Sequence, residues 1–193
     1  MVIAVWMIAI LGLLTAQTPS PAATPSFNNI YRAAVEDAAA WVTPGLAGAR
    51  PVIEVDPRVL GTNGTLPAPG AELHPAQAIA GAAVADRLVV MTLARAEQCR
   101  GIGARTCRNN GAWVGVVLEA PVITGETATM KMLVRMSRPP TDAEKAGLQS
   151  TARGRAGAAR FSEEVGGVTL FQLSLVSKDG AWSVASRKII GQS

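Results

Sequence analysis

The first periodic segment of the chain is FNNIYRAAVEDAAAWV (27–42), where apolar side chains recur at helical spacing. Four of them share one face at about 3.6 residues per turn: Ile30, Ala34, Ala38 and Trp41. Ser26 or Asn28 can cap the first turn, and the TPG sequence at 43–45 ends the pattern. The segment therefore predicts an amphipathic helix whose apolar face packs against the rest of the domain.

Between this helix and residue 93 the pattern is weaker. RPVIEVDPRVL (50–60) contains a short apolar strand, which ends at Asp56-Pro57 because proline cannot donate to a sheet ladder. ELHPAQAIAGAAVADRL (72–88) predicts a second helix with Pro75 in its first turn. VVMTL (89–93) either extends that helix or forms a strand, and its β-branched residues favour the strand.

From residue 112 onward the apolar period changes to two, which is the spacing of strands. AWVGVVLEAPVI (112–123) predicts a strand with a bulge near residues 119–121. TATMKMLVRMS (127–137) alternates without a break, which predicts a strand with one buried face. That face is expected to carry Ala128, Met130, Met132, Val134 and Met136. We interpret the methionines as core residues under a helix rather than as a metal site.

The connection 139–167 is polar and rich in glycine, with one helical turn expected at 142–148. VTLFQLSLVSKDGAWSVASRKII (168–190) predicts a hairpin, because Asp179-Gly180 suits a two-residue turn with positive φ. Three cross-strand pairs follow from this register: Ser177 opposite Trp182, Leu175 opposite Val184, and Leu173 opposite Ser186.

ITGETATMKMLV and FQLSLVSKDGAWSVASRKII together resemble the C-terminal sheet of cystatin-like and NTF2-like α+β domains. The resemblance covers about residues 112–190. It implies two N-terminal helices packed on a curved antiparallel sheet of about four to six strands. Hairpin motifs carry no catalytic residue, so the resemblance implies a fold and no activity. The first half of the chain, with its VDPR strand and cysteine loop, departs from the pattern.

MVIAVWMIAILGLLTA (1–16) carries no charged side chain, and a stretch rich in proline and serine follows it. This length suits the apolar region of a signal peptide but falls short of the about 20 residues that span a bilayer. We expect residues 1–23 to be a signal peptide or N-terminal anchor, 24–27 a linker, and 28–193 a single α+β domain. The protein is then exported to a periplasm, a cell envelope or the extracellular space. The alternative is membrane attachment, through residues 1–16 alone.

The composition fits one domain of this kind. A chain of 193 residues that is 49% hydrophobic can bury a full core. Only 17% of its residues are charged, and the net charge is +4. This mild basic excess attracts anions but is no strong signal of nucleic-acid binding. The sequence identifies no partner and no oligomeric state.

The stretch EQCRGIGARTCRNNG (97–111) holds both cysteines of the chain. An even cysteine count in an exported chain indicates a disulfide, here between Cys99 and Cys107. Their spacing differs from the C-x-x-C of thioredoxin-type redox pairs. A dinucleotide-binding glycine loop is also disfavoured, because a strand rather than a helix follows. Three arginines of the loop are either a small anion-binding patch or solvated charges: Arg100, Arg105 and Arg108.

The chain contains a single histidine, His74, in the sequence ELHP. As a general base it would need an acid to orient it, and Asp56 and Glu72 are the candidates. The alternative is a structural histidine at the start of a helix. A zinc site needs about three or four ligands, and neither His74 nor the cysteines have the spacing of one. We therefore predict no metal and no cofactor.

These observations favour an exported, non-catalytic binding or structural domain of unknown ligand. Two alternatives stay open. One is a small-molecule enzyme that uses an NTF2-like cavity, with His74, Asp56 and Glu72 as its first candidates. The other is anion or envelope-polymer binding through the arginine-rich loop. A concave sheet face filled by side chains argues against the enzyme, because it leaves no room for a substrate.

Overall fold

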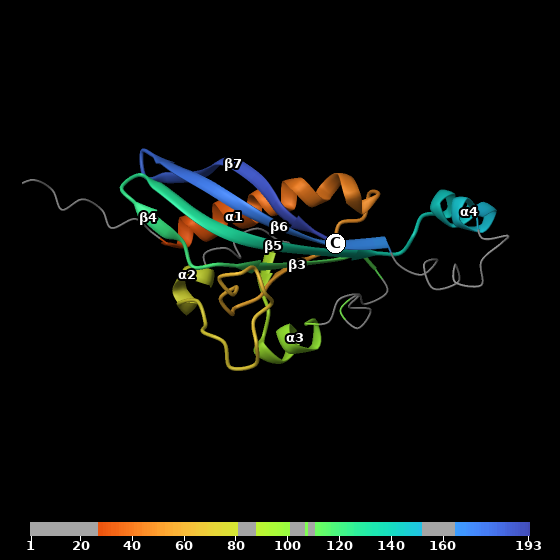
Figure 1. The fold of residues 1–193 in the computed structure, drawn as a ribbon, viewed down its shortest axis with the longest axis horizontal. Coiled ribbons are helices and arrows are strands. Elements are labelled where there is room, and N and C mark those ends of the chain that lie inside the picture. The colour runs from red at the N-terminus through yellow and green to blue at the C-terminus, as the bar shows by residue number, and fades with distance from the viewer. Residues whose placement is uncertain (1–26, 81–87, 101–106, 108–110, 152–164) are drawn as a thin grey trace, which may run out of the picture.

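The computed structural model describes residues 27–80, 88–100, 107, 111–151 and 165–193. Within these ranges the chain forms one sheet with helices on both sides, so the α+β class is confirmed. Figure 1 shows α1 along one face of the sheet, α3 on the other, and α4 beyond one end. The helical elements are α1 (Phe27–Val42), the 3-10 helix η1 (Thr43–Leu46), α2 (Ala76–Ala80), α3 (Leu93–Gln98) and α4 (Asp142–Thr151).

The sheet has seven strands and is mixed. Its strands are β1 (Ile53–Val55), β2 (Leu88–Val90), β3 (Trp113–Leu118), β4 (Val122–Thr124), β5 (Thr127–Arg138), β6 (Val165–Lys178) and β7 (Ala181–Gln192). They lie in the order β2-β1-β3-β5-β6-β7, and β4 pairs with β5. β1 is parallel to both β2 and β3, whereas the pairs from β3 to β7 are antiparallel.

The expectation of a purely antiparallel sheet of four to six strands is therefore wrong at one edge. Parallel neighbours need a crossover connection, and the chain between β1 and β2, which includes α2, provides one. The second helix is also shorter than predicted: α2 covers Ala76–Ala80, residues 81–87 lie outside the described ranges, and Leu88 begins a strand. α3 was not expected. Thr92 starts it by accepting a hydrogen bond from the Arg95 amide.

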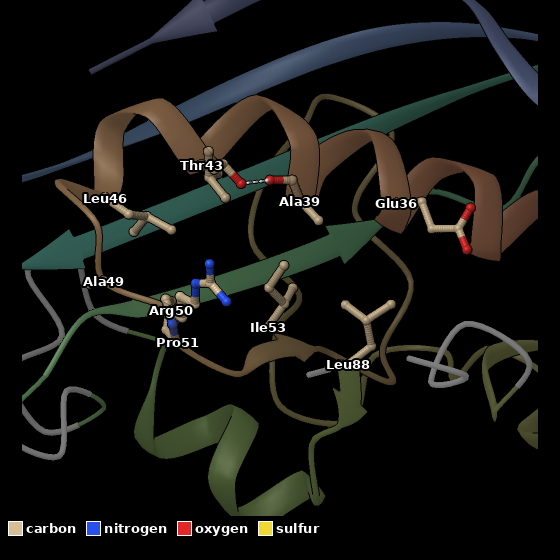
Figure 2. A pocket seen from close by; sticks show the side chains of 10 residues that line it. Glu36, Ala39, Thr43, Leu46, Ala49, Arg50, Pro51, Ile53 and Leu88 are labelled. Carbon is tan, nitrogen blue, oxygen red and sulfur yellow. Dashed lines mark hydrogen bonds between the residues drawn. The ribbon is translucent and has the colours of Figure 1, made fainter. Parts of the chain in front are cut away.

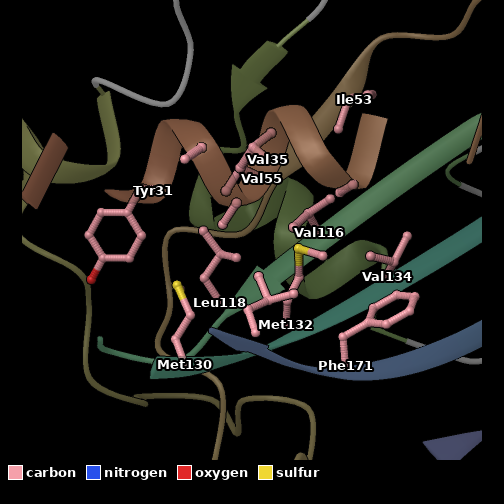
Figure 3. Close-up of a cluster of buried hydrophobic side chains, with 14 of the residues drawn as sticks. Tyr31, Val35, Ile53, Val55, Val116, Leu118, Met130, Met132, Val134 and Phe171 are labelled. Atoms are coloured by element: carbon pink, nitrogen blue, oxygen red, sulfur yellow. The ribbon is translucent and has the colours of Figure 1, made fainter. Parts of the chain in front are cut away.

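The main core lies between α1 and the sheet, as Figure 3 shows. Ile30, Ala34 and Ala38 are fully buried on the predicted face of α1. Along β5 the alternation places Met130 and Met132 under the helix, where they are 1% and 0% exposed. The prediction that these methionines fill the core is confirmed.

The β6–β7 hairpin turns at Asp179 and Gly180, whose φ angles are 53° and 79° as the sequence predicts. Ser177 pairs with Trp182 and Leu175 with Val184, also as predicted. The third predicted pair is wrong, because a register shift between Ser174 and Leu175 places Leu173 opposite Arg187. A bulge of this kind inserts one residue into one strand of the pair. β7 ends the sheet on this side, and no strand of the described chain lies beyond it.

No helix within the described ranges is long and apolar enough to cross a membrane. The predicted signal or anchor segment, residues 1–23, and most of the 24–27 linker lie outside those ranges.

Candidate functional site

A sharp change of direction after α1 creates a cavity at the parallel edge of the sheet. Pro44 stands at the start of η1, and the chain then turns through Ala47 and Gly48, with φ angles of 50° and 83°. The chain runs back from there toward β1, beneath the last turns of α1 (Figure 2). Arg138 of β5 holds this turn, because its Nε donates a 2.8 Å hydrogen bond to the Gly45 carbonyl.

The cavity between α1, η1, β1 and β2 has a volume of about 540 Å³. Ligand pockets of small molecules are commonly about 300–1,000 Å³ and mostly apolar. The apolar lining comes from four elements: Ala39 and Val42 lie on α1, Leu46 on η1, Ile53 on β1, and Leu88 on β2. The described walls therefore combine a suitable volume with a suitable surface.

Three polar side chains also line this cavity. Glu36 and Arg50 lie toward opposite ends of it, with Thr43 on the helix between them (Figure 2). The Glu36 carboxylate forms an ion pair with Arg32, whose Nε lies 3.2 Å away. The Thr43 hydroxyl donates a hydrogen bond to the Ala39 carbonyl at 2.7 Å. Arg50 is exposed and has no ion-pair or hydrogen-bond partner among the side chains that the structure describes.

The histidine proposed as a base is buried, with both ring nitrogens hydrogen-bonded. His74 Nε2 lies 2.9 Å from the Leu118 carbonyl, and Nδ1 lies 2.8 Å from the Tyr31 hydroxyl. A carbonyl only accepts, so Nε2 carries the hydrogen and Nδ1 accepts from Tyr31. Burial lowers the pKa of His74, and burial also raises the pKa of Tyr31 to about 12. The ring is thus neutral and contacts α1 and β3 at once.

The two acids proposed to orient His74 contact other groups. Asp56 is buried and faces Arg58, whose Nε and second terminal nitrogen donate to its two carboxylate oxygens at 2.9 and 2.7 Å. Glu72 is exposed, and its backbone carbonyl accepts a hydrogen bond from the Val59 amide. In the described part of the chain neither carboxylate is hydrogen-bonded to His74.

The predicted disulfide is confirmed: Cys99 and Cys107 are bonded, with the two sulfurs 2.05 Å apart. Both residues are buried, at 1% and 2% exposure, under Trp113 on the sheet face opposite α1. The carbonyl of each half-cystine accepts a hydrogen bond from an arginine of another segment. Arg95 donates to Cys107 at 2.8 Å, and Arg135 donates to Cys99.

These arginines belong to a partly buried polar network. Arg95 pairs with Glu54 at 3.2 Å, the Trp113 indole donates to the same carboxylate at 2.7 Å, and the Arg135 guanidinium lies over the Trp113 ring. Burial lowers the pKa of Arg135. Nearby, Arg58, which pairs with Asp56, also forms an ion pair with Glu97 of α3 at 2.7 Å. The network attaches α3 and the cysteine pair to the sheet.

The loop arginines are only partly described. Arg100 lies 3.5 Å from Glu97, in an ion pair between two partly exposed side chains. Arg105 and Arg108 lie outside the described residues, so the predicted anion patch stays a prediction. Among the described residues no group of three or more histidine, cysteine or acidic side chains is arranged to hold a metal ion.

Sequence reasoning did not identify the cavity. Ala39, Leu46 and Ile53 have the apolar character of core residues, and the cavity beside them depends on how the chain turns after α1. A signal in the sequence was Arg50, a charge between small and apolar residues three positions before the first residue of β1. No protein-family model and no curated protein matches the chain.

Proposed function

We propose that this protein is an exported binding module that holds a small ligand in the cavity between α1 and the β1–β2 edge. The single observation that carries the proposal is the cavity of about 540 Å³, with apolar walls and three polar side chains. A small number of polar groups in a mostly apolar pocket is the usual composition of a small-molecule site.

Export is supported by the disulfide, because such bonds persist outside the reducing cytosol. The apolar segment 1–16 supports it from the sequence, either as a signal peptide or as an anchor. The domain itself is proposed to be cystatin-like or NTF2-like. The antiparallel strands β3, β5, β6 and β7 packed against α1 support that assignment, and the parallel β1–β2 edge is a variation on it.

A non-catalytic role is favoured over the enzyme. Met130, Met132 and Phe171 fill the sheet face under α1, where an enclosed NTF2-like cavity would lie. His74 is neutral and has both nitrogens occupied, which suits a structural role. No specific observation favours the binding of anions or envelope polymers by the loop arginines. Of the three, the structure describes Arg100 alone, and that side chain already pairs with Glu97.

The test is a titration with N-phenyl-1-naphthylamine, an uncharged dye that fluoresces in apolar cavities. We expect saturable binding to the native protein and its loss in Ala49→Trp, because the exposed Ala49 lies at the rim of the cavity. Ala120→Trp, an exposed position between β3 and β4, is the matched control and should leave binding unchanged. Equal binding by all three proteins would show that the dye occupies some other surface, and the proposal would fail.

A further inference from the structure

We infer that the cavity selects amphipathic anions, namely a carboxylate carried on an apolar chain, with Arg50 as the residue that binds the carboxylate. The inference rests on the proposed function and adds the chemical class of the ligand. It follows from the distribution of charge along the cavity and from the position of its apolar walls.

The described lining of the cavity leaves one cation without a partner. Among the described lining residues Glu36 is the one acid, and Arg32 pairs with it at 3.2 Å. Arg50 is the one cation among them and has no ion-pair partner among the described side chains. An entering carboxylate therefore meets an unpaired guanidinium at one end and an ion-paired carboxylate at the other.

Arginine suits this role better than lysine would. Its guanidinium is planar and presents parallel N–H groups that match the two oxygens of a carboxylate. Figure 2 shows the Arg50 side chain turned toward the space between η1 and β1, rather than away from the domain. The guanidinium keeps access to water, so it can exchange solvent for a carboxylate without first breaking an internal ion pair.

The apolar walls determine the rest of the ligand. Beyond Arg50 the lining runs along Ile53 and Leu88 on one side and along Leu46 and Ala39 on the other. The helix rises about 1.5 Å per residue, so the seven steps from Glu36 to Thr43 extend the wall by about 10 Å. A chain lying in this slot is covered by apolar groups along its length, and the carboxylate at its end reaches Arg50.

The test uses isothermal titration calorimetry with octanoate, with octanol as a neutral ligand of the same chain length, and with hexanoate as a shorter acid. In the native protein octanoate should bind more tightly than octanol by about fivefold to tenfold, as expected for a charge-assisted hydrogen bond that is partly exposed to water. Octanoate should also bind about tenfold more tightly than hexanoate, because two further methylene groups are buried.

Arg50→Gln should remove the preference for octanoate over octanol and leave the affinity for octanol unchanged. Arg50→Lys should retain part of the preference, because it keeps the charge and loses the planar geometry. Lys188→Gln is the matched control: it removes one exposed cation from β7, outside the cavity lining, and should keep the native preference.

The outcomes separate the two proposals. If octanoate and octanol bind equally to the native protein and to Arg50→Gln, the anion selectivity is overturned while the binding site stands. If octanoate binds no better than hexanoate, the carboxylate pairs with surface charge outside the cavity and the inference fails. If none of the three ligands binds while the dye still binds the native protein, the ligand class is overturned and the binding site stands. If the dye does not bind either, the proposed function fails along with the inference.

Discussion

At the scale of single residues, His74 is a titratable group that is buried between α1 and the sheet. Its ring joins the Tyr31 hydroxyl of α1 to the Leu118 carbonyl of β3, and the Tyr31 and His74 rings meet edge-on at 4.8 Å. The carbonyl fixes which nitrogen carries the hydrogen, so the ring is held in a single neutral form. Burial is the largest influence on its pKa and lowers it.

This burial predicts how stability depends on pH. Above pH 6.5, the ordinary pKa of histidine, the ring is neutral in both the folded and the unfolded chain. As the pH falls below that value, the unfolded chain takes up a proton that the folded chain excludes. The free energy of unfolding should therefore decrease, by up to about 1.4 kcal/mol per pH unit until the folded pKa is reached.

The measurement is unfolding in urea between pH 7.5 and 5, with His74→Gln as the reference, because glutamine does not titrate in that range. NMR offers a direct check: the chain has one histidine, so its ring Cε1 proton is assigned without ambiguity. A midpoint at or above 6.5 for that proton would contradict the prediction.

At the scale of elements, the cysteine pair closes a short connection between α3 and β3. The two half-cystines are eight positions apart, and arginines from α3 and β5 hold their carbonyls. Each half-cystine is therefore held in two ways: by the disulfide bond and by a hydrogen bond from a guanidinium group to its carbonyl.

Removing the bond should destabilise the protein without altering its fold. We expect Cys99→Ala/Cys107→Ala to lower the free energy of unfolding by about 2–3 kcal/mol, because a loop of this length regains entropy in the unfolded chain. Urea denaturation of the native and variant proteins measures the difference. A free-thiol assay on the unfolded, unreduced native protein should detect no thiol, and two reactive thiols would refute the pairing in the isolated protein.

The long elements of the fold were predictable from the sequence, whereas the short ones were not. β5 has twelve residues, and the alternation of its sequence identifies the strand and the face under α1. The expectation of a single buried face is wrong for its second half, where Leu133 and Arg135 on the other face are also buried. β1 and β2 have three residues each, too few for a period to be recognised, so their parallel pairing was missed. The hairpin turn was correct because Asp179-Gly180 acts locally, but the bulge beyond Ser174 depends on contacts that no local pattern encodes.

The candidate site was less predictable than the fold. Ala39, Leu46 and Ile53 look like ordinary core residues, since an empty volume has no sequence pattern of its own. The disulfide was predictable because the chain has two cysteines and disulfides persist outside the reducing cytosol, where an exported chain is expected to be. By contrast, the ion pairs of Arg58 and Arg95 join segments about forty positions apart, a distance over which sequence spacing carries no information.

At the scale of the whole molecule, the two faces of the sheet are stabilised in different ways. Side chains of α1 cover one face with an apolar core, whereas α3 and the cysteine pair cover part of the other face through the partly buried polar network. Arg58 is central to that attachment, because it joins buried Asp56 to Glu97 of α3. Its hydrogen bond to Asp56 raises its pKa, and burial opposes this rise.

Removing the Arg58 guanidinium should lower the free energy of unfolding. The Arg58 and Asp56 side chains are 5% and 6% exposed, so Arg58→Met leaves a buried carboxylate without its cation. We expect a loss of about 3–5 kcal/mol in the free energy of unfolding. The double variant Arg58→Met/Asp56→Asn should recover part of this lost free energy, because the buried carboxylate charge is then removed as well. Chemical denaturation measures both, and Lys145→Met, which breaks an exposed pair on α4, should change little.

The outer edge of β7, which no described strand covers, has a consequence for how copies of this protein behave at high concentration. A long strand at a sheet edge offers backbone hydrogen-bonding groups to an extended chain that approaches, and such edges promote intermolecular sheet growth. Lys188, exposed on this strand, opposes that growth, because edge-to-edge pairing of two copies brings positive charges close together. We therefore expect self-association through this edge to increase with ionic strength, because salt screens that repulsion and leaves the hydrogen-bonding edge in place.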